Sequence, residues 1–132
     1  MTVFYNKTLR GNPADPDAPK KWFPVLRSIG KLKEKDVAKK VSDETTLNRK
    51  EAEMALCQLE KVLVEALLDG TTVQLGEMGT FKLTIKTKGS DTKDEATAMK
   101  IEKAMVRFVP SVQLREAIAK IHFSSTDNIK KD

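Results

Sequence analysis

The stretch VQLGEMGTFKL, Val73 to Leu83, joins two segments of different periodicity, and it decides the fold. Gly76 and Gly79 stand three positions apart within it. A phosphate-binding P-loop would require the G-x-x-x-x-G-K-[ST] spacing and a helix directly after the glycines. Here Gly79 leads into a strand-like run, and the chain contains no Gly-Lys-Ser or Gly-Lys-Thr. The glycines therefore predict a sharp bend or bulge between two extended segments rather than a nucleotide site.

A long amphipathic helix is expected before this corner, over residues 49–69. Asn48 and Glu51 have the spacing of an N-cap and its N3 partner, and Gly70 supplies a residue that ends helices in the left-handed conformation. A shorter amphipathic helix is expected over 32–42. Apolar side chains recur at three- and four-residue spacing along the long helix, at Ala52, Ala55, Leu56, Leu59, Val62, Leu63, Ala66 and Leu67. So wide a stripe in a small protein predicts that a partner subunit covers it.

After the corner the hydrophobic period changes to two, which is typical of a strand with one apolar face. Phe81, Leu83 and Ile85 alternate with Lys82, Thr84, Lys86 and Lys88, so one face is expected to be core and the other basic. The polar stretch GSDTKDEAT predicts a turn or mobile tip, and AMKIEKAMVRFVP predicts the returning strand. Ser111 is expected to cap a short final helix.

The first 31 residues differ in composition from the rest of the chain. TVFYNKTL is strand-like, RGNPADPDAPKK is a loop rich in Pro, Asp and Gly, and WFPVLRSIG suits an edge strand because it contains a proline. Six basic side chains stand against two acidic ones in this segment. We expect a basic N-terminal ribbon over residues 1–31, a main domain over 32–123, and a flexible tail over 124–132.

The bulk composition excludes several classes of protein. The 132 residues are enough for one ordinary domain, and the formal charge of +5 allows contact with nucleic acid or an anionic surface. We expect no membrane span and no signal peptide, which predicts a cytoplasmic protein. Cys57 is interpreted as a small buried hydrophobe and His122 as a C-terminal helix cap. Because these are the sole cysteine and histidine, no catalytic site, metal site, cofactor or small-molecule substrate is expected.

Charge alone does not decide the role of the basic face. Residues 71–109 hold seven basic and five acidic side chains. Strand faces commonly carry lysine simply to remain solvated and to discourage aggregation, so a solvated edge is a full alternative to an anion-binding surface.

Two long stretches resemble the bacterial histone-like HU and integration host factor family. They are LNRKEAEMALCQLEKVLVEALLDGTTVQLGEMGTFKL and VRFVPSVQLREAIAKI, and the segment RGNPADPDAPKKWFPV is similar to the extension of HU-related variants of the Bacteroides group. The resemblance implies an α+β fold with a helical base, an antiparallel sheet with a protruding β-ribbon arm, and a short C-terminal helix. It also implies a non-catalytic homodimer whose arms reach around double-stranded DNA through the minor groove.

The resemblance implies that basic residues of the arm and the final helix contact DNA phosphates, with help from the extension. These residues are Lys82, Lys86, Lys88, Lys100, Lys103, Arg107 and Arg115, together with Lys20, Lys21 and Arg27. The sequence also departs from the family pattern: the arm tip lacks the wedging proline, Thr84 stands at a usually basic position, Val109 and Val112 flank Pro110, and Glu77 and Met78 alter the Gly-Phe-Gly corner. Weaker or altered DNA contact is therefore expected.

The leading hypothesis is an architectural DNA-binding protein of low sequence specificity in the bacterial nucleoid. Its rival is an HU-like fold used as a protein–protein assembly module, with the N-terminal ribbon pairing with the sheet edge of a partner. The acidic arm tip and the lost basic positions favour that rival. An enzyme that uses His122 is the third and weakest hypothesis.

Overall fold

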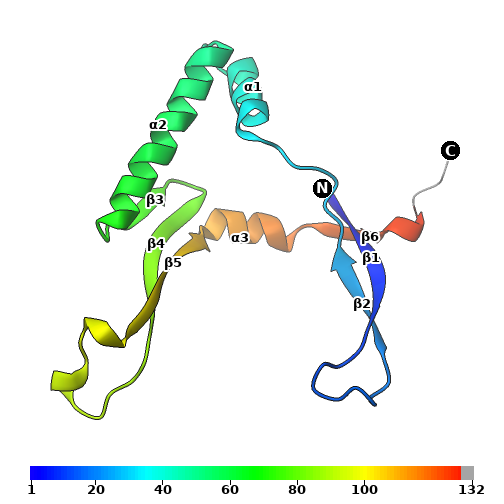
Figure 1. The fold of residues 1–132 in the computed structure, drawn as a ribbon. Helices are drawn as coiled ribbons and strands as arrows, with labels where there is room; N and C mark the ends of the chain where they lie inside the picture. Colours follow the sequence, from blue (N-terminus) through cyan, green and yellow to red (C-terminus); the bar gives the residue numbers. More distant parts are fainter. Residues whose placement is uncertain (129–132) are drawn as a thin grey trace. The chain divides into compact units, whose positions relative to one another are not determined.

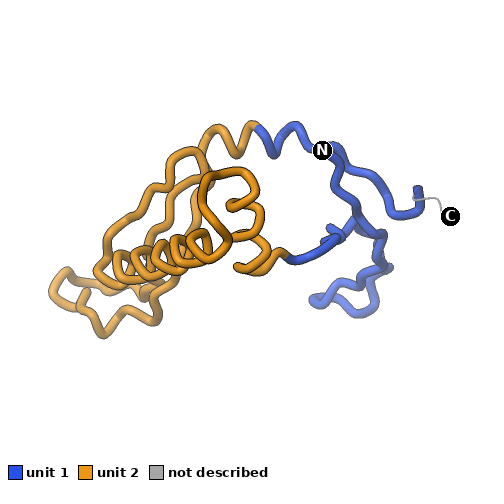
Figure 2. The backbone as a smooth tube through the Cα atoms, turned by 90° about the horizontal axis from the view of Figure 1, so that it is seen from above, with its two compact units in different colours: residues 1–31, 117–132 blue, residues 32–116 orange. Residues whose placement is uncertain are grey.

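The computed structural model describes residues 1–128 of the chain and contains two compact units (Figure 2). One unit combines residues 1–31 with the chain from Ala117 onward, and the other spans Leu32–Glu116. The first unit is therefore built from both ends of the sequence.

Two helices that pack against each other form the helical part of the second unit: α1 spans Glu34–Glu44 and α2 spans Arg49–Leu68 (Figure 1). The predicted cap of α2 is confirmed, because the Asn48 side chain accepts a hydrogen bond of 2.9 Å from the backbone N–H of Glu51, and the Glu51 carboxylate accepts one from the N–H of Asn48. At the other end Gly70 adopts a φ of 77°, which confirms the predicted helix stop.

The core of a single chain is small. Ala38 of α1 and Ala52 and Leu67 of α2 are the buried hydrophobic residues in the described part of the chain. Large apolar side chains of the α2 stripe remain exposed, among them Leu59 and Val62. The interpretation of Cys57 as a buried residue was wrong, because its helix face is not covered in the single chain and the thiol is exposed.

The sheet of the second unit has the strand order β3-β4-β5, and all its pairings are antiparallel. β3 spans Val73–Leu75, β4 Gly79–Thr87 and β5 Ile101–Pro110. β4 and β5 extend as a hairpin that is closed by the loop of residues 88–100 (Figure 1). Two short 3-10 turns, at Lys93–Glu95 and Ala98–Lys100, give this polar loop local structure.

The predicted corner lies between β3 and β4. Gly76 and Gly79 have φ values of 44° and 151°, which residues with a Cβ atom rarely adopt. The turn is held from outside by Ser111, whose backbone N–H donates to the Met78 carbonyl at 3.1 Å and whose hydroxyl donates to the Glu77 carbonyl. The glycines thus form a structural bend, as predicted.

The same serine begins the last helix, α3, which spans Val112–Ala119. Its Oγ accepts a hydrogen bond of 3.1 Å from the backbone N–H of Leu114, so the predicted N-cap is confirmed. Because the Ser111 side chain both donates to the β3–β4 turn and accepts from α3, it fixes the start of the helix against the corner.

The first unit is a three-stranded sheet of order β2-β1-β6. β1 spans Thr2–Arg10, β2 Lys21–Leu26 and β6 His122–Ser125. β1 and β2 pair as the antiparallel ribbon that the sequence predicts, whereas β6 joins β1 in parallel. The interpretation of His122 as a helix cap was wrong: its backbone N–H donates to the Met1 carbonyl, because strand pairing with β1 takes over directly after the helix.

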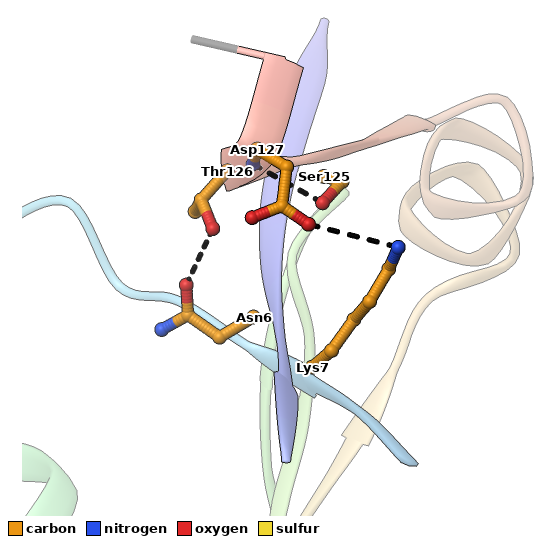
Figure 3. A network of polar contacts seen from close by, with 5 residues as sticks. All are labelled: Asn6, Lys7, Ser125, Thr126 and Asp127. Carbon is orange, nitrogen blue, oxygen red and sulfur yellow. Dashed lines mark hydrogen bonds and ion pairs between the residues drawn. The ribbon is translucent and has the colours of Figure 1, made fainter. Parts of the chain in front are cut away.

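The chain after β6 is tied to β1 by polar side chains (Figure 3). Thr126 donates a hydrogen bond of 2.8 Å to the side-chain oxygen of Asn6, and Asp127 forms an ion pair of 3.6 Å with Lys7. Ser125 is buried, and its hydroxyl accepts from the N–H of Asp127. Residues 124–128, expected to belong to a flexible tail, therefore lie in β6 and a 3-10 turn, while 129–132 lie outside the described residues.

Candidate functional site

The β4–β5 hairpin has two chemically different faces. Residues that lie directly opposite each other on paired strands share a face. The register pairs Phe81 with Phe108 and Leu83 with Val106, which makes one face apolar, and the two phenyl rings have centroids 4.9 Å apart. The expectation that this face is core holds only in part, because Leu83 and Val106 are exposed in the single chain.

The opposite face of the hairpin carries two cross-strand pairs of cations. Lys82 lies opposite Arg107, and Lys86 lies opposite Lys103, with the Thr84–Met105 pair between them. Four of the ten predicted site residues thus share one face of two neighbouring strands. Like charges directly opposite each other destabilise a sheet, so this arrangement is one that an anion would relieve. We name Lys82, Lys86, Lys103 and Arg107 the arm cations.

Two further predicted residues lie at the far end of the same hairpin. Lys88 follows β4 directly, and its backbone N–H donates to the Lys100 carbonyl at 2.9 Å. Lys88 is exposed, whereas Lys100 is half-buried at the end of its 3-10 turn. Six of the ten predicted DNA-binding residues therefore lie on this hairpin, distributed from its base to its tip.

The remaining predicted residues lie on other elements. Arg115 is exposed on α3. Lys20, Lys21 and Arg27 are exposed in the first compact unit, before, within and after β2. They share no sheet or helix with the arm cations.

Sequence reasoning did not find the acidic partner of this surface. The Glu102 carboxylate lies 3.7 Å from the Lys86 Nζ and 3.8 Å from the Lys88 Nζ. In the sequence Glu102 is one of five acids within residues 71–109, and pairing it with these lysines requires the strand register, which the hydrophobic pattern does not give. The available signal was an acid directly before Lys103 and two positions after Lys100.

A small cluster of possible metal ligands was also not expected. The ligand atoms of Glu34, Cys57 and Glu60 all lie within 4.8 Å of one another. All three side chains are exposed, and exposed acidic groups gather in this way without a metal. The cluster therefore supports no metal chemistry on its own.

The comparison with known families agrees with this architecture. The family model described as "HU domain fused to wHTH, Ig, or Glycine-rich motif", HU-HIG, matches residues 1–125. The chain belongs to this family. No curated protein matches the chain in sequence. Within the described residues, no helix is long and apolar enough to cross a membrane.

Solved structures show the same fold as the HU-HIG chain. A crystal structure of a proposed bacterial DNA-binding protein from Bacteroides vulgatus ATCC 8482 matches 95% of the chain with a TM-score of 0.62 at 15% identity. The chain spans about half of that protein, 48% of its length. A mutant of HU from Thermotoga maritima has a TM-score of 0.51 at 17% identity, covering 66% of this chain and 99% of its own. An Anabaena HU, crystallised with DNA, has a TM-score of 0.55 at 16% identity, covering 67% and 99%.

These likenesses support the α+β, HU-like fold that the sequence predicts. The two HU structures are covered almost completely while a third of this chain remains outside the match. The Bacteroides protein covers nearly the whole chain. The fold of the HU-HIG chain is thus an HU-like part with added segments.

Proposed function

We propose that the protein is a non-catalytic, architectural DNA-binding protein of low sequence specificity that acts as a homodimer in the nucleoid. The arm cations carry this proposal. The opposed pair of Lys82 and Arg107, which has no acidic partner among the described ion pairs, costs stability in the free protein, and a DNA backbone supplies the regularly spaced anions that offset the cost. The HU–DNA crystal structure among the similar folds adds support for DNA as the ligand.

Low specificity is proposed because the hairpin offers charge rather than base recognition. Lysine side chains bind phosphate as point charges, and phosphate contacts carry no sequence information. The arm loop of residues 88–100 contains no proline and presents Asp91, Asp94 and Glu95. We therefore propose that the arm follows the DNA backbone and bends the duplex less than an arm with a proline wedge would.

A homodimer is proposed because a single chain leaves its apolar faces uncovered. Val62 of α2 is 50% exposed, and Leu83, Ile85 and Val106 of the hairpin are exposed as well. Exposed apolar patches of this kind on a small protein mark an interface. A second copy would cover them and would place two arms in one DNA-binding particle.

Arg115 and the basic residues Lys20, Lys21 and Arg27 are proposed as additional phosphate contacts. We also propose residues 32–123 as the DNA-binding domain and 1–31 as an extension that adds basic residues to the chain. These assignments rest on exposure and charge.

A fluorescence-anisotropy titration on a random-sequence duplex tests the proposal. The variant Lys82→Gln/Arg107→Gln should bind at least about tenfold more weakly in low salt. Its slope of log affinity against log salt should be shallower by about 1.8, since each phosphate contact contributes about 0.9. The matched control, Lys35→Gln/Lys39→Gln on α1, removes the same charge away from the hairpin. Equal weakening by both variants, or no binding by the wild type, would refute the proposal.

One observation favours the assembly module as a second candidate. The β1 register places Trp22, Leu26 and Phe123 on the same face of the first unit's sheet, where they are 68%, 67% and 65% exposed. Leu26 and Phe123, together with Tyr5 and Pro24, line a hollow of about 480 Å³. An exposed apolar sheet face with such a hollow suits a protein partner.

One variant distinguishes the two candidate functions, DNA binding and protein assembly. Trp22→Ser/Phe123→Ser removes apolar surface from the first unit and leaves every arm cation in place. If assembly through this face is the function, the variant loses self-association or partner binding in sedimentation experiments. If DNA binding is the function, its duplex affinity stays within about twofold of wild type, since neither residue carries charge.

A further inference from the structure

The pairing of β4 and β5 is irregular where the hairpin approaches its tip. Lys86 lies opposite Lys103, but the next residue of β4, Thr87, lies opposite Ile101. Glu102 is therefore an extra residue of β5 with no cross-strand partner. Such a bulge bends the strand and redirects the side chain of the extra residue.

The bulge places the Glu102 carboxylate between two cations. One carboxylate oxygen lies 3.7 Å from the Lys86 Nζ, and the other lies 3.8 Å from the Lys88 Nζ. In a regular strand Glu102 would point away from its neighbour Lys103, toward the apolar face. The irregular pairing lets it serve the basic face instead.

Glu102 differs in this respect from the other acids of the arm. Within residues 1–128, Asp91, Asp94 and Glu95 form no ion pair. The Glu102 side chain is also less exposed, at 34%, than the two lysines that it joins, at 61% and 71%. The carboxylate is thus held near the strand while the ammonium groups remain open to solvent.

We propose that Glu102 is an internal competitor for DNA phosphate that occupies Lys86 and Lys88 in the free protein and limits the affinity of the arm. This inference rests on the proposed function. A carboxylate shared by two ammonium groups takes the position that a phosphate oxygen would take. DNA must displace Glu102 to engage the outer lysines, whereas Lys82 and Arg107, nearer the base of the hairpin, have no such competitor among the described ion pairs.

The weakness of exposed ion pairs lets the competition be reversible. Solvent and salt screen such pairs, so the closely spaced phosphates of DNA can replace the carboxylate. The retained negative charge still repels the phosphate after displacement. The result is an arm that binds firmly near its base and loosely toward its tip.

Anisotropy titrations of the full chain with Glu102→Gln test this inference. The variant should bind a random duplex about three- to tenfold more tightly than the wild type in low salt, because its neutral side chain no longer competes for Lys86 and Lys88. The slope of log affinity against log salt should steepen by up to about 1.8, or about 0.9 for each freed lysine. The matched control is Glu95→Gln, which makes the same charge change on the same arm and should stay within about twofold of wild type.

A double-mutant comparison distinguishes competition for Lys86 from a general effect of removing one negative charge. Lys86→Gln should weaken binding more in the Glu102→Gln background than in the wild-type background, because Lys86 contacts phosphate freely only when Glu102 is neutral. Additive effects would overturn the inference. Equal affinities of wild type, Glu102→Gln and Glu95→Gln would overturn it while leaving the proposed function intact. Failure of all three proteins to bind duplex DNA would overturn the proposed function and the inference together.

Discussion

At the residue scale, Gly79 shows why this chain turns at its corner. A Cβ built there would lie 2.4 Å from the Val109 carbonyl oxygen and 2.8 Å from a ring carbon of Phe108, and the φ of 151° disfavours any side chain. The glycine therefore meets two independent requirements. The spacing of Gly76 and Gly79 predicted a bend, but the close approach of β5 could not be predicted, because it depends on pairing with a strand that comes much later in the sequence.

Gly79→Ala is expected to lower the free energy of unfolding by about 2–4 kcal/mol, since it combines backbone strain with a steric clash against main-chain atoms. Urea denaturation followed by circular dichroism measures the change. Gly89→Ala is the matched control: an added Cβ there meets no atom within 4 Å, so the change should stay within about 0.5 kcal/mol. Equal stability of the two variants would contradict the role assigned to Gly79.

At the element scale, features that depend on local sequence were predicted, whereas features that depend on pairing with a distant strand were not. The helix bounds of α2 and its cap followed from Asn48, Glu51 and Gly70, because each acts within one helical turn of its position. The bulge at Glu102 and the parallel strand β6 did not follow from the sequence. Both depend on a partner strand, and a single strand's hydrophobic period does not fix its register.

Asn48→Ala should destabilise α2 and with it the helical unit by about 1 kcal/mol, because the backbone N–H of Glu51 loses its acceptor. Thermal denaturation followed by helical circular dichroism gives the difference. Gln58→Ala, at an exposed position inside the same helix, should change stability by less than about 0.5 kcal/mol. A neutral Asn48→Ala substitution would show that water satisfies the helix end equally well.

At the scale of the whole molecule, the small core explains why the wide apolar stripe was an informative signal. Only three hydrophobic residues of the described chain are buried, and six of the eight apolar residues of the predicted α2 stripe are exposed or half-buried in the single chain. In the proposed dimer, covering the apolar faces would leave the basic hairpin face free for the proposed contact with DNA. The sequence predicted both faces, but not how little a single chain buries.

Val62→Asp on the exposed stripe of α2 is expected to dissociate the proposed dimer, because it would bury an unpaired carboxylate at the interface. Multi-angle light scattering should show the wild type at twice the chain mass and the variant at the chain mass. The wild-type melting temperature should also rise with protein concentration, as expected for coupled folding and association. Lys61→Gln, one position away and exposed, should leave the mass unchanged.

The sheet of the first unit depends on segments that are far apart in the sequence, because β6 pairs with β1. β1 receives β2 on one side and β6 on the other. Without β6, an isolated two-stranded hairpin would remain, and such hairpins are marginally stable in water. Truncation after Ile121 should therefore unfold residues 1–31 while the helices of the second unit persist.

Backbone amide hydrogen exchange makes this prediction measurable, since the N–H groups of the β1–β2 ladder are protected only while the ribbon is folded. After truncation at Ile121 these amides should exchange as fast as in the urea-denatured chain, with helical circular dichroism retained. Truncation after Asn128 is the control, because it keeps β6 and the bonds of Thr126 and Asp127 to β1. If the β1–β2 amides stay equally protected in both truncated chains, the β1–β2 ribbon folds without β6, and the prediction is wrong.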